Sequence, residues 1–292
     1  MDSPELALAV ITFVAAIVNG ALGYGFSSIT VPLALLFMAN RVLNPALVVI
    51  EVALNAYVLW VNRVALPRVW RRVLPVVVGL LPGVVVGTAI VSQFNPAWLK
   101  FLTFLVLLPL IFMQAAGYRR PIRAERSAGL VFGSGLGILY SATTISGPPL
   151  AVALLNQGLT KKDFRAALGF VRLAESSLTA VAYLWFGLYT TTSLSLIPWI
   201  LPSLALGVPL GVILIRRFEP DTFRRACLSF DAWIVAFGLS RLTLELGMVA
   251  GGRAYLILAT VVGLDAWMLY RFFTLHNRTV EAPEAFSHRA TS

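Results

Sequence analysis

Cysteine, histidine and charged residues are all scarce in this chain of 292 residues. The one cysteine, Cys227, excludes an internal disulfide and argues against a metal site built from cysteines. The two histidines, His276 and His288, both lie near the carboxyl terminus, so we expect neither a histidine metal cluster nor a histidine-based catalytic triad in the rest of the chain. The sequence therefore predicts no metal and no cofactor.

Charged residues make up only 12% of the chain, against roughly 25% in a typical soluble domain. Apolar residues make up 59%, and several apolar runs approach or exceed the ~20 residues needed to cross the hydrocarbon core of a bilayer. The first ten residues, MDSPELALAV, lack the basic region of a signal peptide and are expected to belong to the mature chain. We expect an all-α polytopic membrane bundle that forms a single transmembrane domain over residues 1–292. The clearest apolar runs are 46–61, 73–91, 98–116 and 254–270.

A net charge of +10 would suit a nucleic-acid-binding protein, but the arginines stand between apolar segments. That distribution is typical of short cytoplasmic loops in membrane proteins, so no nucleic-acid partner is expected. The chain also lacks the motif G-x-x-x-x-G-K-[ST], and ATP-driven pumping is not predicted. The arginines form three groups: Arg63, Arg68, Arg71 and Arg72; Arg119, Arg120, Arg123 and Arg126; and Arg216, Arg217, Arg224 and Arg225.

The chain repeats itself internally. A shift of 117 residues places Gly20 on Gly137 and Pro32 on Pro149, and a shift of 124 places SQFNPAWLK on RRFEPDTFR. These matches predict one repeat over about 5–116 and a second over about 126–245. An extra transmembrane helix over about 254–273 and a polar tail over 274–292 would follow.

The charges of the loops are reversed between the two repeats. The loop after 46–62 is rich in arginine, whereas its equivalent in the second repeat, 187–195, carries no charge. The nearly neutral loop 92–97 corresponds instead to the stretch with Arg216 and Arg217. If basic loops are cytoplasmic, the two repeats have inverted topology. The amino terminus would then lie outside and the carboxyl terminus in the cytoplasm.

Each repeat begins with an apolar segment that Gly, Ser, Thr and Pro interrupt, VNGALGYGFSSITVP in the first and GLGILYSATTISGPP in the second. Backbone groups freed inside a bilayer cost several kcal/mol each unless they are satisfied. We expect segments 5–38 and 126–156 to be broken, re-entrant helical hairpins; the alternative is one tilted helix, kinked at glycine, in each repeat.

The second half of each hairpin would be a short helix, over 28–38 and 147–156. Serine, threonine and glycine favour helix starts, and proline fits the first turn. Free N–H groups at two helix starts would form an anion site near the bundle centre. The alternative is that the glycines serve helix packing, which we favour for Gly79, Gly83 and Gly87.

At these residues the chain resembles the sulfite exporter TauE/SafE family of membrane transport proteins, also called TSUP or DUF81. The resemblance rests on NGALGYGFSSITVPLALL in the first repeat and SGPPLAVALLNQGLTKKDFRAAL in the second, and runs over about the first 245 residues. It implies transport of small sulfur-containing anions such as sulfite, sulfoacetate or thiosulfate. Where many members carry a Gly-Gly pair, this chain has Ala142, Thr143 and Thr144, which leaves the identity of the anion open.

Ionisable residues at membrane depth are candidates for function. Arg172 would bind the anion, and Glu51 and Glu175 would couple its movement to protons; a structural pair of Arg172 with Glu175 is the alternative. Asp231, Arg241, Glu245 and Asp265 are expected nearer helix ends or paired among themselves. The expected substrate-binding residues are Gly23, Tyr24, Gly25, Ser27, Ser28, Thr30, Asn55, Tyr140, Thr143, Thr144, Ser146, Gly147 and Arg172.

We therefore expect secondary transport, in the direction of export, of a small sulfur-containing anion across the bacterial inner membrane. An anion channel, or a carrier for another small carboxylate or oxyanion, is the alternative. A membrane-embedded enzyme is a third option, but no nucleophile–base pair is evident and none is predicted. The expected partners are the anion, the lipid bilayer and a coupling ion, H⁺ or Na⁺. The oligomeric state stays open, a homodimer being one option.

Overall fold

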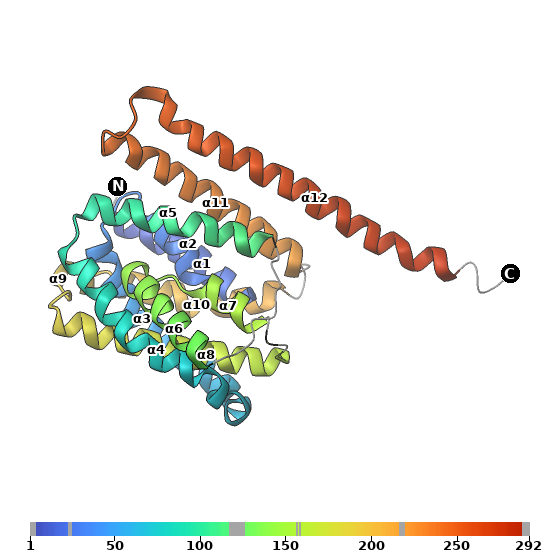
Figure 1. Ribbon diagram of the computed structural model, residues 1–292, viewed down its shortest axis with the longest axis horizontal. Helices are drawn as coiled ribbons and strands as arrows, with labels where there is room; N and C mark the ends of the chain where they lie inside the picture. The colour runs from blue at the N-terminus through green and yellow to red at the C-terminus, as the bar shows by residue number, and fades with distance from the viewer. Residues whose placement is uncertain are drawn as a thin grey trace.

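The computed structural model describes residues 4–22, 25–116, 126–155, 157, 159–215 and 220–287, and every regular element among them is helical (Figure 1). This confirms the expected all-α fold. Seven helical segments in the described ranges are long and apolar enough to cross a membrane, and one of them, Asn40–Gln93, contains two successive long helices. The elements are α1 (Pro4–Leu22), α2 (Phe26–Ala34), α3 (Asn40–Asn62), η1 (Arg63–Ala65), α4 (Leu66–Gln93), α5 (Pro96–Ala115), α6 (Arg126–Thr143), α7 (Gly147–Leu155), α8 (Lys161–Trp185), α9 (Thr191–Leu194), α10 (Ile197–Leu214), α11 (Pro220–Glu245), η3 (Gly251–Tyr255) and α12 (Leu256–Ser287).

Both interrupted segments consist of two separate helices. The first interruption separates α1 from α2, and the second separates α6 from α7. Because α2 and α7 have nine residues each, they are about 14 Å long, roughly half the thickness of the hydrocarbon core. A single continuous helix in each repeat is therefore not what forms. The helix expected over 28–38 was wrong at both ends. It begins two residues earlier, at Phe26, and it ends at Ala34, where a turn follows. The re-entrant course of the two hairpins stays a prediction.

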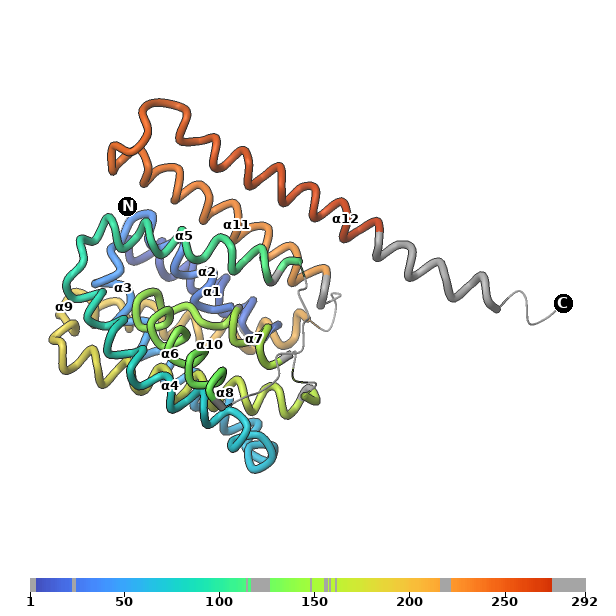
Figure 2. Tube along the Cα trace, in the orientation of Figure 1, coloured from blue at the N-terminus to red at the C-terminus, as the bar shows by residue number. Residues whose placement is uncertain are grey.

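Helix packing joins the two halves of the chain crosswise. α1 packs along α10, and α4 packs along α6, so segments far apart in sequence lie side by side (Figure 2). α3 packs against α8, and α5 against α11. The repeat alignment equates α1 with α6 and α4 with α10, so the first two contacts are equivalent to each other. The halves thus pack as two repeats would, and their inverted orientation stays a prediction.

Glycines bring α4 and α6 into direct backbone contact. A Cβ atom built on Gly83 would lie 2.1 Å from the carbonyl oxygen of Ser134, and Gly79 and Gly87 face α6 equally closely. The same arrangement joins α10 to α1, where a Cβ on Gly211 would lie 2.0 Å from the oxygen of Ile17. These contacts confirm the packing interpretation of Gly79, Gly83 and Gly87, because small residues let membrane helices approach closely.

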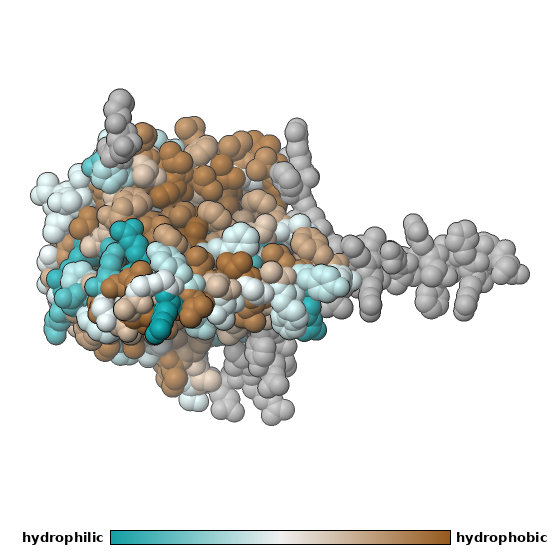
Figure 3. Space-filling view, turned by 90° about the horizontal axis from the view of Figure 1, so that it is seen from above, coloured by the Kyte–Doolittle hydropathy of each residue, from teal (hydrophilic) through white to brown (hydrophobic). Residues whose placement is uncertain are grey.

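The outer surface is largely apolar. Figure 3 shows a face on which hydrophobic side chains predominate in the upper part, with polar and intermediate side chains mixed among them below. Large apolar residues such as Val131 and Leu206 are 75% and 67% exposed. In water such a surface would be unfavourable, but in a bilayer lipid tails cover it. The exposed helix faces therefore suit a membrane-spanning bundle.

The carboxyl-terminal helix α12 lies at the edge of the bundle against α11 (Figure 1). The extra helix was expected over 254–273, but α12 continues to Ser287, so the first part of the expected polar tail is helical. A buried ion pair joins the two helices, because Arg225 of α11 donates to Asp265 of α12 at 2.7 Å. The assignment of Arg225 to a basic loop was therefore wrong. Arg241 and Glu245 form an exposed pair with each other, as expected, whereas Asp265 pairs with Arg225 and not with another of the four residues expected to pair among themselves.

Candidate functional site

Glu51 lies in the middle of α3 and is completely buried. Its carboxylate accepts hydrogen bonds from three other helices. Arg172 of α8 donates through Nη2 to Oε1 at 2.9 Å, and the hydroxyl of Tyr140 of α6 donates to Oε2 at 2.7 Å. The hydroxyl of Ser27, in the first turn of α2, also donates to Oε1. Glu51 therefore ties the first interrupted segment to the second repeat.

Glu175 is a second buried carboxylate, one turn beyond Arg172 on α8. The hydroxyl of Ser146, just before α7, donates to its Oε2, while its Oε1 is buried without a hydrogen-bond partner among the described residues. The alternative of a structural pair of Arg172 with Glu175 was wrong, because the Arg172 side chain forms its ion pair with Glu51 across the α3–α8 interface. The three-residue spacing of Arg172 and Glu175 suggests a pair within one helix, but it carries no information about the contact between α3 and α8.

The two carboxylates occupy equivalent places in the two repeats. The shift of 124 residues that aligns the later parts of the repeats places Glu51 on Glu175. Each accepts a hydroxyl hydrogen bond from a serine beside the interruption in its own repeat, Ser27 or Ser146. The equivalence of Glu51 and Glu175 is visible in the sequence, and it is the signal that relates the two serine–glutamate contacts to each other.

Side chains satisfy the backbone where α6 ends. Tyr183 of α8 donates to the carbonyl of Ser141, and Asn44 of α3 donates to that of Ala142 at 2.9 Å. The Ile145 N–H donates to the hydroxyl of Thr143 at 3.1 Å. Such partners replace the bonds that a continuous helix would have made. Thr144 follows with φ of 58°, a conformation that is strained for a β-branched residue and is found most often at functional sites.

The first interruption is built differently from what was expected. Gly25, with φ of 107°, precedes α2 as its N-cap, so Ser27 and Ser28 lie inside the first turn and do not cap it. The Ser28 hydroxyl donates back to the carbonyl of Gly25 at 3.1 Å and does not reach Glu51. Thr30 is buried, and its hydroxyl has no partner among the described residues. Two further candidates, Gly23 and Tyr24, lie outside the described residues.

The remaining candidates lie around the same cluster. Asn55 of α3 donates to the backbone carbonyl of Arg172 at 3.4 Å. Gly147 begins α7, and no other atom lies within 4 Å of the place a Cβ would take. The space beside Gly147 is therefore open, so its lack of a side chain is not needed for helix packing. In the described ranges, no group of three or more His, Cys, Asp and Glu side chains could hold a metal ion.

Two adjoining cavities lead to Arg172. The inner one, of about 10 Å³, holds at most one water molecule and is lined by Asn55 and Arg172. The outer one, of about 350 Å³, lies between α1, α3, α8 and α10 and reaches Arg165 and Asn62. The charged side chains that line the two cavities are both arginines. The residues shared by both cavities are Asn19, Leu54, Val58 and Leu168.

Asn19 is the functional candidate that sequence reasoning missed. It lies near the end of α1, is 5% exposed and lines both cavities. Its position directly before Gly20 and the first interruption could have indicated it.

The outer cavity lies at the basic end of the bundle, because Asn62 is followed by Arg63 and Ile215 by Arg216.

In membrane proteins, buried ionisable residues mark substrate or ion pathways, and interrupted helices are found at the substrate sites of many transporters. The chain belongs to the sulfite exporter TauE/SafE family, whose model matches residues 8–237. That range includes both interruptions and Glu51, Arg172 and Glu175, and it ends before α12.

The chain is also similar to the probable sulfite/organosulfonate exporter TauE of Cupriavidus necator. The two are 26% identical over 174 residues, which is 58% of this chain and 64% of the relative. No solved structure matches the chain.

Proposed function

We propose that this protein is a secondary transporter that exports a small sulfur-containing anion, such as sulfite or an organosulfonate, and that Arg172 is its main anion-binding side chain. The family and the name of the relative from Cupriavidus necator support the substrate class. The observation that carries the role of Arg172 is its burial between the two interrupted segments, next to a cavity that continues toward the basic end.

Arg172 has the chemistry that an oxyanion requires. A guanidinium presents its N–H donors in a planar fork, which matches the oxygens of a sulfite or sulfonate. The group is 4% exposed, and only its Nη2 is engaged with Glu51, while its Nε is buried without a partner among the described residues. The guanidinium therefore keeps a donor for a ligand. An incoming anion would compete with Glu51 for this side chain.

Charge balance links anion binding to a proton. Glu51 neutralises Arg172 when the site is empty, and an anion would add a negative charge next to Glu51 and Glu175. A buried charge without compensation costs several kcal/mol, so anion binding is favoured when a carboxyl carries a proton. A protonated Glu51 would release Arg172 to bind the anion, and the hydroxyls of Ser27 and Tyr140 could then turn to it as well. The coupling ion is accordingly H⁺.

The position of the two cavities supports entry of the anion from the cytoplasmic side. They reach Arg172 from the end of the bundle that carries Arg63 and Arg165, and loops rich in arginine lie on the cytoplasmic side. Entry from the cytoplasm agrees with export. The inner cavity is too small for sulfite, so Asn19, Leu54, Val58 and Leu168 must separate when the anion passes.

A flux assay on purified protein in proteoliposomes tests this function. The panel comprises sulfite, thiosulfate, sulfoacetate, taurine, sulfate and formate, with liposomes without protein as the control. We expect saturable flux and counterflow for one of the sulfur-containing anions. Flux without saturation or counterflow would indicate a channel, and preference for formate would indicate a carrier of another class.

A further inference from the structure

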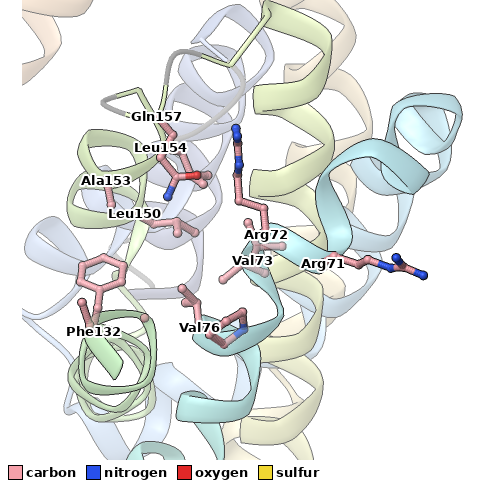
Figure 4. Close-up of a pocket in the computed structure, with 13 residues that line it drawn as sticks. Arg71, Arg72, Val73, Val76, Phe132, Leu150, Ala153, Leu154 and Gln157 are labelled. Atoms are coloured by element: carbon pink, nitrogen blue, oxygen red, sulfur yellow. The ribbon is translucent and has the colours of Figure 1, made fainter. Parts of the chain in front are cut away.

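A larger cavity, of about 570 Å³, lies between α4, α6, α7 and α8, away from the path to Arg172 (Figure 4). α6 and α7 follow each other in sequence, but α6 packs mainly on α4, and α7 packs on α5 and α8. The space between them is lined by apolar side chains, among them Phe132 of α6, Leu150 and Leu154 of α7, and Val73 and Val76 of α4.

Polar side chains stand at one end of this cavity. In Figure 4 the side chain of Arg72 extends beside Leu154 and Gln157, while Arg71 points away. The guanidinium of Arg72 forms neither an ion pair nor a hydrogen bond with any described residue, in contrast to Arg68, which approaches Asp163 at 3.8 Å. The buried Oε1 atom of Gln157 likewise has no partner among the described residues. Arg72 and Gln157 therefore both line this cavity, and among the described residues neither the guanidinium nor the Oε1 atom has a partner.

The polar end lies at the depth of lipid headgroups. Arg72 is in the second turn of α4, next to Trp70, which is 37% exposed and carries the guanidinium of Arg71 at 5.3 Å from its ring centroid. Tryptophan and arginine gather where the hydrocarbon core meets the headgroups. With 28 residues, α4 is about 42 Å long and extends beyond a core of ~30 Å.

We propose that this cavity binds phosphatidylglycerol, with an acyl chain among the apolar side chains, the phosphate on Arg72 and a glycerol hydroxyl donating to Gln157. Basic pockets between membrane helices on the cytoplasmic side bind anionic headgroups. The apolar lining suits an acyl chain and is unfavourable for a small hydrated oxyanion, so the site is distinct from that at Arg172. The headgroup hydroxyl supplies the donor that Gln157 lacks, and phosphatidylcholine has no such donor.

The test measures lipid binding to the purified full-length protein by native mass spectrometry, with phosphatidylglycerol and phosphatidylcholine of the same acyl chains. We expect phosphatidylglycerol to bind about tenfold more tightly, because the ammonium of phosphatidylcholine offsets the phosphate charge that Arg72 attracts and its headgroup lacks the hydroxyl for Gln157. Arg72→Gln should remove this preference. Arg63→Gln is the matched control, because Arg63 is an arginine near the same end that stacks on Trp60 and does not line the cavity.

A second variant tests the apolar part. Ala153→Phe places a ring in the cavity and should weaken the binding of both lipids about tenfold or more, while circular dichroism confirms the helical fold. Glycerol 1-phosphate, which lacks acyl chains, should not displace the bound lipid. Equal binding of the two lipids to the wild-type protein, equal effects of Arg72→Gln and Arg63→Gln, unchanged binding by Ala153→Phe, or displacement by glycerol 1-phosphate would each overturn the proposal. The assay does not depend on transport, so its outcome is separate from that of the proposed function.

Discussion

Glu51 is the residue on which the buried cluster depends. Its carboxylate is fully buried, and it is satisfied by one guanidinium and two hydroxyls from three other helices. Breaking a buried ion pair by removing one partner costs about 3–5 kcal/mol, because the other charge is left uncompensated. The cluster therefore couples the charge state of one side chain to the packing of α2, α3, α6 and α8.

The two serines of α2 give a matched test of this cluster. Ser27→Ala removes a hydrogen bond to Glu51, whereas Ser28→Ala removes one to the Gly25 carbonyl. In the proposed mechanism the Ser27 hydroxyl turns from protonated Glu51 to the bound anion, and hydrogen bonds to charged groups contribute about 1.5–3 kcal/mol, so Ser27→Ala should raise the half-saturating anion concentration about tenfold. Ser28→Ala should leave it nearly unchanged. Transport kinetics in proteoliposomes measure both, and equal effects of the two changes would remove Ser27 from the site.

Glu175 gives a test of proton coupling. If it carries a proton with the anion, transport by the wild-type protein should fall as pH rises, because the deprotonated carboxylate repels the anion. Glu175→Gln keeps an acceptor for Ser146 and has no charge, so its transport should fall less across the same pH range. Initial rates measured from pH 5 to 9 check this. Glu245→Gln, at an exposed ion pair, serves as the control and should follow the wild-type profile.

The residues of the site could be predicted from the sequence, but the contacts between them could not. Glu51, Arg172 and Glu175 are noticeable in the sequence because charges at membrane depth are rare and costly. Glu51 is separated from Ser27, Tyr140 and Arg172 by 24, 89 and 121 positions, and no local pattern encodes such contacts. Asn19 escaped notice because an uncharged amide in an apolar helix gives a weaker signal than a charge.

At the scale of elements, the close packing of α4 on α6 and of α10 on α1 depends on glycines that face the partner helix. Gly83→Ala would place a methyl group against the backbone of Ser134, and such overpacking costs about 1–3 kcal/mol. We expect a lower melting temperature in detergent for this variant. Gly135 of α6 is the matched control, because a Cβ there would meet no other atom within 4 Å. Gly135→Ala should melt at or above the wild-type temperature, since alanine favours the helix. Equal melting temperatures for the two variants would contradict the packing of α4 on α6.

The interruptions were predictable because Gly, Ser, Thr and Pro stand out within long apolar runs. Their geometry was harder to predict, because the sequence indicated a helix that starts at Ser28, whereas α2 starts at Phe26, after Gly25 in a left-handed conformation that glycine adopts readily. The pairing of α1 with α10 and of α4 with α6 was not predicted either. Regularly spaced small residues indicate that a helix packs closely against another helix, but they do not identify which one.

At the scale of the whole molecule, the orientation in the membrane is open to direct test. We expect the basic end in the cytoplasm, and α8 to run from that end to the opposite one. In a Cys227→Ser background, a membrane-impermeant maleimide should label a cysteine at Thr192 in intact cells, whereas one at Lys162 should react only after permeabilisation. Both side chains are exposed, so accessibility does not depend on unfolding. Labelling of the Lys162 position in intact cells would reverse the proposed orientation.

The central claim is that Arg172 holds the transported anion, and counterflow in proteoliposomes of the labelled sulfur-containing anion that the flux panel identifies tests it most directly. The informative variant is Glu51→Gln with Arg172→Met, which removes both charges of the pair together and so avoids an unpaired buried charge. We predict a folded protein with wild-type yield and melting temperature but no saturable counterflow. Counterflow by this double variant with the half-saturating concentration of the wild-type protein would contradict the claim.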